Sequence, residues 1–153
     1  MEDKTIEKVD FSIEKLETNY YECTFDKCNF SDKPIGRVIF EKCTLVKTSN
    51  TSWLDVLFTD CKMTGINFSL SNRFGLSVEF HNCLLSYALF TEMKLKGTRF
   101  IGCDLQNTDF METDLSNAVF KDCDLCYASF HHTNLEKADF TTARNYTLNP
   151  AAN

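Results

Sequence analysis

Residues 80–140 read FHNCLLSYALFTEMKLKGTRFIGCDLQNTDFMETDLSNAVFKDCDLCYASFHHTNLEKADF, and a phenylalanine or a leucine occupies every fifth position without a break. The two residues alternate strictly along the stretch: Phe80, Leu85, Phe90, Leu95, Phe100, Leu105, Phe110, Leu115, Phe120, Leu125, Phe130, Leu135, Phe140. A mostly small residue, such as Ala88, Cys103 or Thr108, stands two positions before each of them. A period of five fits neither an α-helix, at about 3.6, nor a flat strand, at about two. It is typical of a chain that makes one wall and one corner per unit and always turns the same way.

This pattern resembles the pentapeptide repeat family over roughly residues 20–145. The resemblance implies an all-β fold, a right-handed quadrilateral β-helix with four units per coil and about six coils in this chain. A single coil cannot bury its own centre, whereas stacked coils pair their backbones at about 4.8 Å and share one core. Residues 1–19 repeat poorly, so we expect them to cap the first coil, and residues 146–153 to form a C-terminal tail.

The alternation of phenylalanine and leucine has a structural meaning in a four-walled coil. Units ten residues apart face each other, and residues twenty apart stack on one another. We therefore expect two opposed columns of rings, with leucines on the other two walls; the columns are Phe80, Phe100, Phe120, Phe140 and Phe90, Phe110, Phe130. Burial of each ring contributes roughly 1.5–3 kcal/mol, which offsets the chain entropy lost in so narrow a structure.

The N-terminal half follows the same rule with two interruptions. Inward residues run from Tyr20 to Leu45 in steps of five, resume at Trp53, and return to the regular frame at Phe80. The residues in excess fall within 46–52 and 69–77, which we interpret as two outward loops. When the units are counted along the chain from Tyr20, we take Leu45 and Trp53 as the inward residues of consecutive units.

The eight cysteines raise the question of a redox or metal site. Cys123 and Cys126 form a Cys-x-x-Cys pair, a spacing that indicates a dithiol or a metal clamp in other proteins. Here Cys123 takes the inward small position and Cys126 points outward, so the two thiols lie on opposite sides of one wall. The count places the remaining inward cysteines on two walls, with Cys61, Cys83 and Cys103 beside Cys123 and with Cys23 and Cys43 on the next wall; Cys28 is also inward. A straight ladder does not offer the tetrahedral ligands of zinc, so we expect no metal and no cofactor.

Composition narrows the class of protein. The formal net charge is −6 and no basic stripe is present, so direct binding of nucleic acid is not expected. The start, MEDKTIEKVDF, is charged and no apolar run approaches membrane-spanning length, which favours a cytoplasmic protein with reduced thiols. The three histidines take outward positions and no glycine-rich phosphate loop occurs, so we do not expect an enzyme.

Outward acids gather in the regular half, with Lys121 the only base among them; they are Asp104, Asp109, Glu112, Asp114, Asp122 and Asp124. Within the family, the stretches LDVLFTDCKMTGINF (54–68) and FGLSVEFHNC (74–83), with the two loops, most resemble the quinolone-resistance proteins and their chromosomal relatives. Members of that subgroup bind DNA gyrase and topoisomerase IV, imitate DNA in shape and charge, and protect the enzymes from fluoroquinolones. The resemblance therefore implies a DNA mimic that acts on a type II topoisomerase.

The alternative is a scaffold whose walls bind some other protein. In the mimic, the acids supply long-range attraction and the loops supply specificity through polar or apolar side chains; the loop residues are Lys47, Ser49, Asn50, Asn72, Arg73 and Phe74. Since the last coil, at Phe140, has little sequence after it to cover it, we also expect that two copies could stack there as a homodimer.

Overall fold

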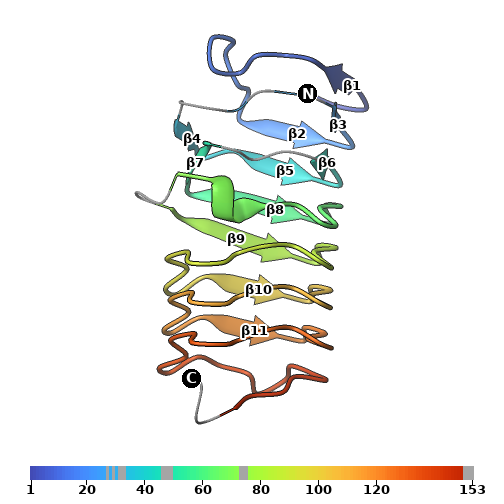
Figure 1. Ribbon diagram of the computed structural model, residues 1–153. Coiled ribbons are helices and arrows are strands. Elements are labelled where there is room, and N and C mark those ends of the chain that lie inside the picture. Colours follow the sequence, from blue (N-terminus) through green and yellow to red (C-terminus); the bar gives the residue numbers. More distant parts are fainter. Residues whose placement is uncertain (27, 29, 31–33, 46–49, 73–75, 150–153) are drawn as a thin grey trace.

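The computed structural model describes residues 1–26, 28, 30, 34–45, 50–72 and 76–149, which wind into one β-solenoid (Figure 1). Within these residues the chain forms short strands and one 3-10 turn, and no helix there is long and apolar enough to cross a membrane. The elements are β1 (Thr5–Glu7), β2 (Asn19–Tyr21), β3 (Thr24–Asp26), β4 (Pro34–Gly36), β5 (Ile39–Glu41), β6 (Thr44–Leu45), β7 (Ser52–Leu54), β8 (Val56–Thr59), η1 (Phe68–Leu70), β9 (Val78–His81), β10 (Arg99–Ile101) and β11 (Val119–Lys121).

The first wall of the solenoid is a parallel sheet of six strands in the order β11-β10-β9-β8-β5-β2. Figure 1 shows these strands as successive rungs from the N-terminal to the C-terminal end. Phe80 pairs with Phe58 on one side and with Phe100 on the other, so each rung lies one turn after the last. A bridge between Val119 and Asp139 carries the wall beyond β11. The predicted all-β solenoid is therefore confirmed.

Three more walls follow the first in chain order, and each is a ladder of backbone bridges. The second wall contains Lys62, Leu84, Asp104 and Asp124, the third Asn67, Leu89, Asp109 and Ser129, and the fourth Lys94, Asp114 and Asn134. In the regular half, successive residues of a ladder are twenty apart, so four units make one coil. Each ladder residue directly precedes an inward residue of its unit and points outward.

The core consists of the two opposed aromatic columns that the sequence predicts. On the first wall, the rings of Phe80 and Phe100 are nearly parallel, with centroids 5.2 Å apart, and on the third wall Phe90 and Phe110 are 5.3 Å apart. The columns meet edge to face, as between Phe100 and Phe110 at 5.8 Å and 77°. Offset and edge-to-face ring pairs are the favoured aromatic geometries, so the core gains both from burial and from ring contacts.

Most corners are made with a left-handed backbone two positions after an inward residue. The φ angle there is 57° at Glu112, 58° at Asn117 and 56° at Asp122, for example, and among the described residues glycine takes the position only at Gly65, Gly97 and Gly102. A left-handed conformation costs most residues about 1–2 kcal/mol. The fold therefore turns without a high glycine content, and the stacked walls offset the strain.

The inward small residues also satisfy backbone carbonyls. The Thr113 hydroxyl donates to the Phe90 carbonyl at 2.7 Å, and the Cys103 thiol donates to the Phe80 carbonyl at 3.3 Å. Both bonds link one coil to the coil before it. Threonine and cysteine at these positions therefore fill volume and pair carbonyl groups that lie inside the solenoid.

One part of the expected register is wrong. Phe40 pairs with Phe58, and Ile35 pairs with Trp53, so Trp53 lies on the fourth wall while Leu45 lies on the second. Leu45 and Trp53 are therefore not consecutive units, because the third wall comes between the second and the fourth in chain order. The backbone pairing decides this, since it keeps the two first-wall strands β5 and β8 in register.

The corrected register also places the inward cysteines in a single column. Cys43, Cys61, Cys83, Cys103 and Cys123 each donate to the carbonyl of the first-wall residue one coil earlier, which places them in one column. The expectation that Cys43 lies on a different wall from Cys61 is wrong for the same reason. Seven cysteines are buried and Cys126 is half-buried, as the inward and outward assignment predicts.

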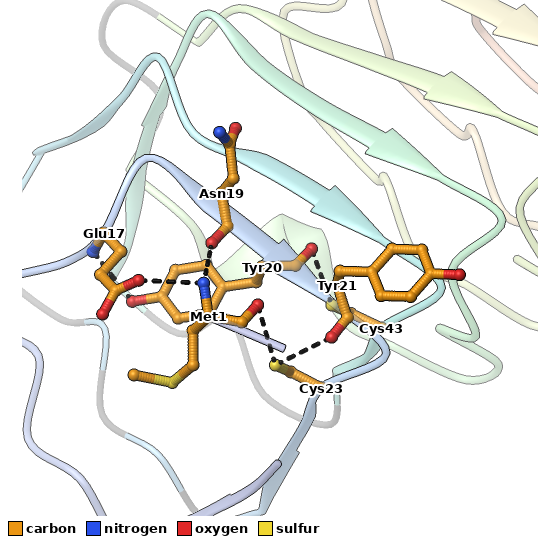
Figure 2. A network of polar contacts seen from close by, with 7 residues as sticks. All are labelled: Met1, Glu17, Asn19, Tyr20, Tyr21, Cys23 and Cys43. Carbon is orange, nitrogen blue, oxygen red and sulfur yellow. Dashed lines mark hydrogen bonds and ion pairs between the residues drawn. The ribbon is translucent and has the colours of Figure 1, made fainter. Parts of the chain in front are cut away.

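The N-terminal residues continue the winding above the first coil. β1 pairs in parallel with β3, so Ile6 lies beside Phe25, and the Phe11 ring stacks on Phe30 at 4.9 Å. Figure 2 shows how the chain start is held: the Met1 ammonium donates to the Glu17 carboxylate at 2.9 Å and to the Asn19 carbonyl at 2.8 Å.

The same network reaches the core. The Tyr20 hydroxyl accepts the Glu17 backbone N–H at 3.0 Å, and burial raises the pKa of Tyr20. Figure 2 also shows the Cys23 thiol donating to the Tyr21 carbonyl. Residues 1–19 thus cover this end of the aromatic column, where Phe11 contacts Tyr20, Phe25 and Phe30.

At the other end, the Phe140 ring stacks on Phe120 at 4.8 Å and is half-buried. The Tyr146 ring lies 5.1 Å from Phe140 and covers part of it. The expected stacking of a second copy on this end stays a prediction.

Candidate functional site

The structure separates the six acids that the sequence groups together. Asp104 and Asp124 lie on the second wall, Asp109 on the third and Asp114 on the fourth. Glu112 follows the third wall at a left-handed corner, and Asp122 follows the first wall at another. The six acids therefore surround the rod and do not form one band.

Four of these acids have a structural task. The backbone N–H two residues later donates to the carboxylate in each case: Gln106 to Asp104 at 3.1 Å, Met111 to Asp109 at 2.9 Å, Ser116 to Asp114 at 3.0 Å and Cys126 to Asp124 at 3.1 Å. This is the Asx-turn bond, which fixes the backbone at the start of a turn. The acids of the ladders thus hold the corners in place as well as carrying charge.

Asp114 differs from the others in its charge environment. The backbone bond from Ser116 is the main cause that lowers the pKa of Asp114, and the positive charge of Lys96 also lowers it. Asn134 donates to the same carboxylate at 3.1 Å. The negative charge of Asp114 is therefore stabilised by neighbours on its own wall.

Charge is segregated between the walls of the regular half. The second wall, the third wall and the corners after them comprise residues 84–92, 104–112 and 124–132, all of which the structure describes. These segments contain no Lys or Arg, and their acids are Glu92, Asp104, Asp109, Glu112 and Asp124. The bases between them, Lys94, Lys96, Arg99 and Lys121, lie on the fourth and first walls. We call residues 84–92, 104–112 and 124–132 the acidic face.

Bases mark both ends of the acidic face along the second wall. Lys62 bridges to Leu84 at the N-terminal end of the face, and Arg144 bridges to Asp124 at the C-terminal end. Glu92, which the sequence analysis missed, lies twenty residues before Glu112 and takes the same corner one coil earlier. Grouping the acids by wall, instead of by proximity along the chain, would have found it.

Two loop residues of the expected site are described. Asn50 is exposed, and its N–H donates to the Leu70 carbonyl at 2.6 Å. Asn72 is also exposed, and its N–H donates to the Thr51 carbonyl at 2.8 Å. The two chain segments therefore pair on adjacent coils.

The segment that pairs with Asn50 lies next to the acidic face. The rings of Phe68 and Phe90 stack at 5.0 Å, so Leu70, two residues after Phe68, lies one coil before Glu92, two residues after Phe90. The other expected loop residues lie outside the described residues: Lys47, Ser49, Arg73 and Phe74.

The thiols and histidines of the described residues do not form a metal cluster. Hydrogen bonds to neighbouring thiols and burial raise the pKa of Cys43, Cys83 and Cys123. The imidazole of His81 lies 3.2 Å from the Glu79 carboxylate on an exposed wall. These thiols are packed as core residues, and the histidine belongs to a solvated surface.

The repeat can be compared with known proteins. The family model described as "Pentapeptide repeat region" matches residues 94–149. No curated protein sequence matches the chain significantly.

Solved structures match almost the whole chain. A trypsin-treated variant of QnrB1, described as a plasmid-mediated fluoroquinolone resistance protein, is 22% identical with a TM-score of 0.85 over 99% of this chain and 76% of that one. A second trypsin-treated QnrB1 variant is 25% identical with a TM-score of 0.68 over 99% and 77% of the two chains. HetL from the cyanobacterium Nostoc is 17% identical with a TM-score of 0.60 over 91% and 71%. The unbroken five-residue period, the four-walled coils and these matches show that the chain has the β-helix fold of the solved pentapeptide repeat structures, and residues 94–149 match the family model.

Proposed function

We propose that this protein is a non-enzymatic binding protein that acts on a type II topoisomerase, DNA gyrase or topoisomerase IV, by presenting its acidic face where the enzyme holds DNA. The observation that carries the proposal is the segregation of charge, with five acids and no Lys or Arg on residues 84–92, 104–112 and 124–132. The likeness in fold to QnrB1, a fluoroquinolone resistance protein, supports this choice of partner. Protection of the enzyme from fluoroquinolones is the expected consequence.

The physical basis is electrostatic. A row of carboxylates on two adjacent walls produces a negative field that attracts a basic groove before contact, which raises the association rate and weakens with salt. The bases on the fourth and first walls reduce the field on the opposite side of the rod. A partner is therefore drawn to one side of the molecule.

Specificity is proposed to come from the loop segments beside the acidic face. Asn50 and Asn72 are exposed at the paired stretch, and residues 47–49 and 73–75 adjoin them in the chain. Replacement of Lys47, Ser49 and Arg73 by alanine, which keeps the chain length between the walls, should reduce protection of gyrase while the thermal stability of the rod is retained.

The central test removes charge without removing the turn bonds. In the triple variant Asp104→Asn, Asp109→Asn and Asp124→Asn, each amide oxygen still accepts the backbone N–H of its turn. The matched control is Glu79→Gln, Glu136→Gln and Asp139→Asn, which removes three charges from the first and fourth walls. Asp139 also accepts a turn N–H, from Thr141 at 2.8 Å, so the control includes the same kind of residue.

Gyrase supercoiling with a fluoroquinolone present, and gyrase binding at low salt, give the readout. The first variant should lose protection and the control should keep it. Equal losses would mean that total charge matters and not the acidic face. If the wild-type protein neither binds nor protects gyrase or topoisomerase IV at low salt, the mimic is excluded and a scaffold for another protein remains.

A further inference from the structure

The coil at residues 83–92 departs from the pattern of the coils below it. Leu84 and Leu89 bridge directly to Asp104 and Asp109, so they occupy the same outward ladder positions one coil earlier. Leu84 is 46% exposed and Leu89 is 37% exposed. Two leucines thus face solvent where the next coil has two aspartates.

The corner between these leucines is also unusual. Tyr87 takes the left-handed position with φ 62° and is 61% exposed. Tyr127, two coils further on at the same corner, has φ 59° and is 83% exposed, while Asn107 lies between them in the column. Asparagine adopts this conformation more readily than a bulky side chain does. We call Leu84, Tyr87, Leu89 and Tyr127 the Leu–Tyr patch.

The residues of the Leu–Tyr patch reduce the stability of their turns and make no contact in the core that would offset this loss. A leucine cannot accept the turn N–H that Asp104 and Asp109 accept two residues later. A tyrosine at a left-handed corner adds strain, and its ring stays in water. Exposed apolar residues that gather within an otherwise polar surface are typical of interaction sites, and tyrosine is enriched among the residues that dominate binding.

The surrounding charge indicates what the patch would bind. Along the ladders, Leu84 lies between Lys62 and Asp104, and Leu89 lies between Asn67 and Asp109. The patch belongs to the acidic face, and no Lys or Arg occurs on residues 84–92, 104–112 and 124–132. A guanidinium group pairs with carboxylates and also stacks on an aromatic ring, whereas the lysine ammonium is a more strongly hydrated point charge. Exposed leucines favour an apolar side chain next to that group.

We propose that the Leu–Tyr patch is the short-range anchor of the acidic face and binds a partner surface that carries arginine beside an apolar side chain. The identity of the partner rests on the proposed function, whereas the chemistry of the patch does not. The patch contributes apolar and ring contacts made only at close approach, so it acts mainly on the dissociation rate.

The decisive variant converts this coil to the pattern of the next one: Leu84→Asp, Tyr87→Asn and Leu89→Asp, matching Asp104, Asn107 and Asp109. The new side chains can accept the turn bonds and adopt the corner, so the melting temperature should be retained. The variant is also more acidic than the wild type. Attraction by charge alone would therefore make it bind a basic partner more tightly, and the proposal requires the opposite.

Gyrase binding is measured first, with the wild-type protein and this variant at the same salt concentration. The Kd should rise by at least about tenfold, as expected for loss of a dominant contact. An unchanged or lower Kd in a variant that keeps its melting temperature would overturn the inference and leave the proposed function in place.

If the wild-type protein does not bind gyrase, the proposed function fails and a peptide probe decides the inference. A short peptide of alternating arginine and leucine is titrated into labelled protein, and backbone amide shifts are followed by NMR. Shifts centred on residues 84–89 and 127, lost in the variant and several-fold weaker with a lysine–leucine peptide, would support the patch. Shifts spread over all walls, or equal responses to both peptides, would overturn it.

Discussion

Replacement of Phe110 by alanine tests the aromatic columns most directly. The Phe110 side chain is fully buried, with Phe90 and Phe130 stacked on either side at 5.3 and 5.4 Å and the rings of Phe100 and Phe120 meeting it edge to face at 5.8 Å. Large-to-small changes of a buried phenylalanine cost about 3–5 kcal/mol. The four walls are held by backbone ladders and cannot collapse into the space. We therefore expect a loss toward the upper end of that range in urea unfolding.

The neighbouring outward residue provides the matched control. Asp109→Ala removes the carboxylate that accepts the Met111 N–H, so it should cost about 1 kcal/mol. Asp109→Asn keeps an acceptor and should stay within about 0.5 kcal/mol. The three variants should share one urea m-value. If Phe110→Ala costs no more than Asp109→Ala, the alternation of inward and outward residues is refuted.

Three further outcomes follow from the same geometry. Under reducing conditions, a thiol reagent should modify Cys126 rapidly and the seven buried cysteines slowly, and several fast thiols would contradict the inward assignment. Gly102→Ala should destabilise the protein slightly more than Gly97→Ala in thermal melts, because both have a left-handed φ but the Gly102 Cβ would also displace the Asn82 side chain, whose Oδ1 lies 2.5 Å from it. The Asp114 pKa is lowered in the folded state, so its contribution to stability is present above the unfolded value of about 4 and is lost as the pH falls through the folded pKa. Asp114→Asn should therefore flatten the acid limb of stability against pH, and an unchanged limb would exclude this role.

The sequence predicts the walls of the regular half correctly because the repeat is local. Each unit places its own inward residues, so Phe80 to Phe140 need no long-range information to find their columns. The register across residues 45–53 is different, because the spacing of eight residues has two interpretations. It can be one unit with three extra residues, or two units with two residues missing. The pairings of Phe40 with Phe58 and of Ile35 with Trp53 choose between them. The equal spacing of Cys43–Cys61 and Phe40–Phe58, eighteen residues each, is the signal that would have decided it.

The candidate site was less predictable than the fold for a physical reason. Asp114 and Asp109 are close in sequence but lie on different walls, while Glu92 and Glu112 are distant in sequence and lie at one corner on adjacent coils. A solenoid therefore groups charge by its period of twenty, and not by local composition. The turn bonds of Asp104 and Asp109 depend on side-chain geometry that composition does not reveal.

The turn bonds also constrain how such a rod could imitate DNA. Asp104 and Asp124 stand one coil apart, about 4.8 Å, whereas phosphates rise about 3.4 Å along each strand. Each carboxylate is tied to a backbone N–H, so the spacing of the row cannot adjust to that of the phosphates. Imitation must then be of field and width, which salt screens over about 10 Å at 0.1 M. The contacts proposed for the Leu–Tyr patch are made at close range and are screened much less than the long-range field, so added salt should slow association of the partner while the effect of the patch variant on dissociation persists.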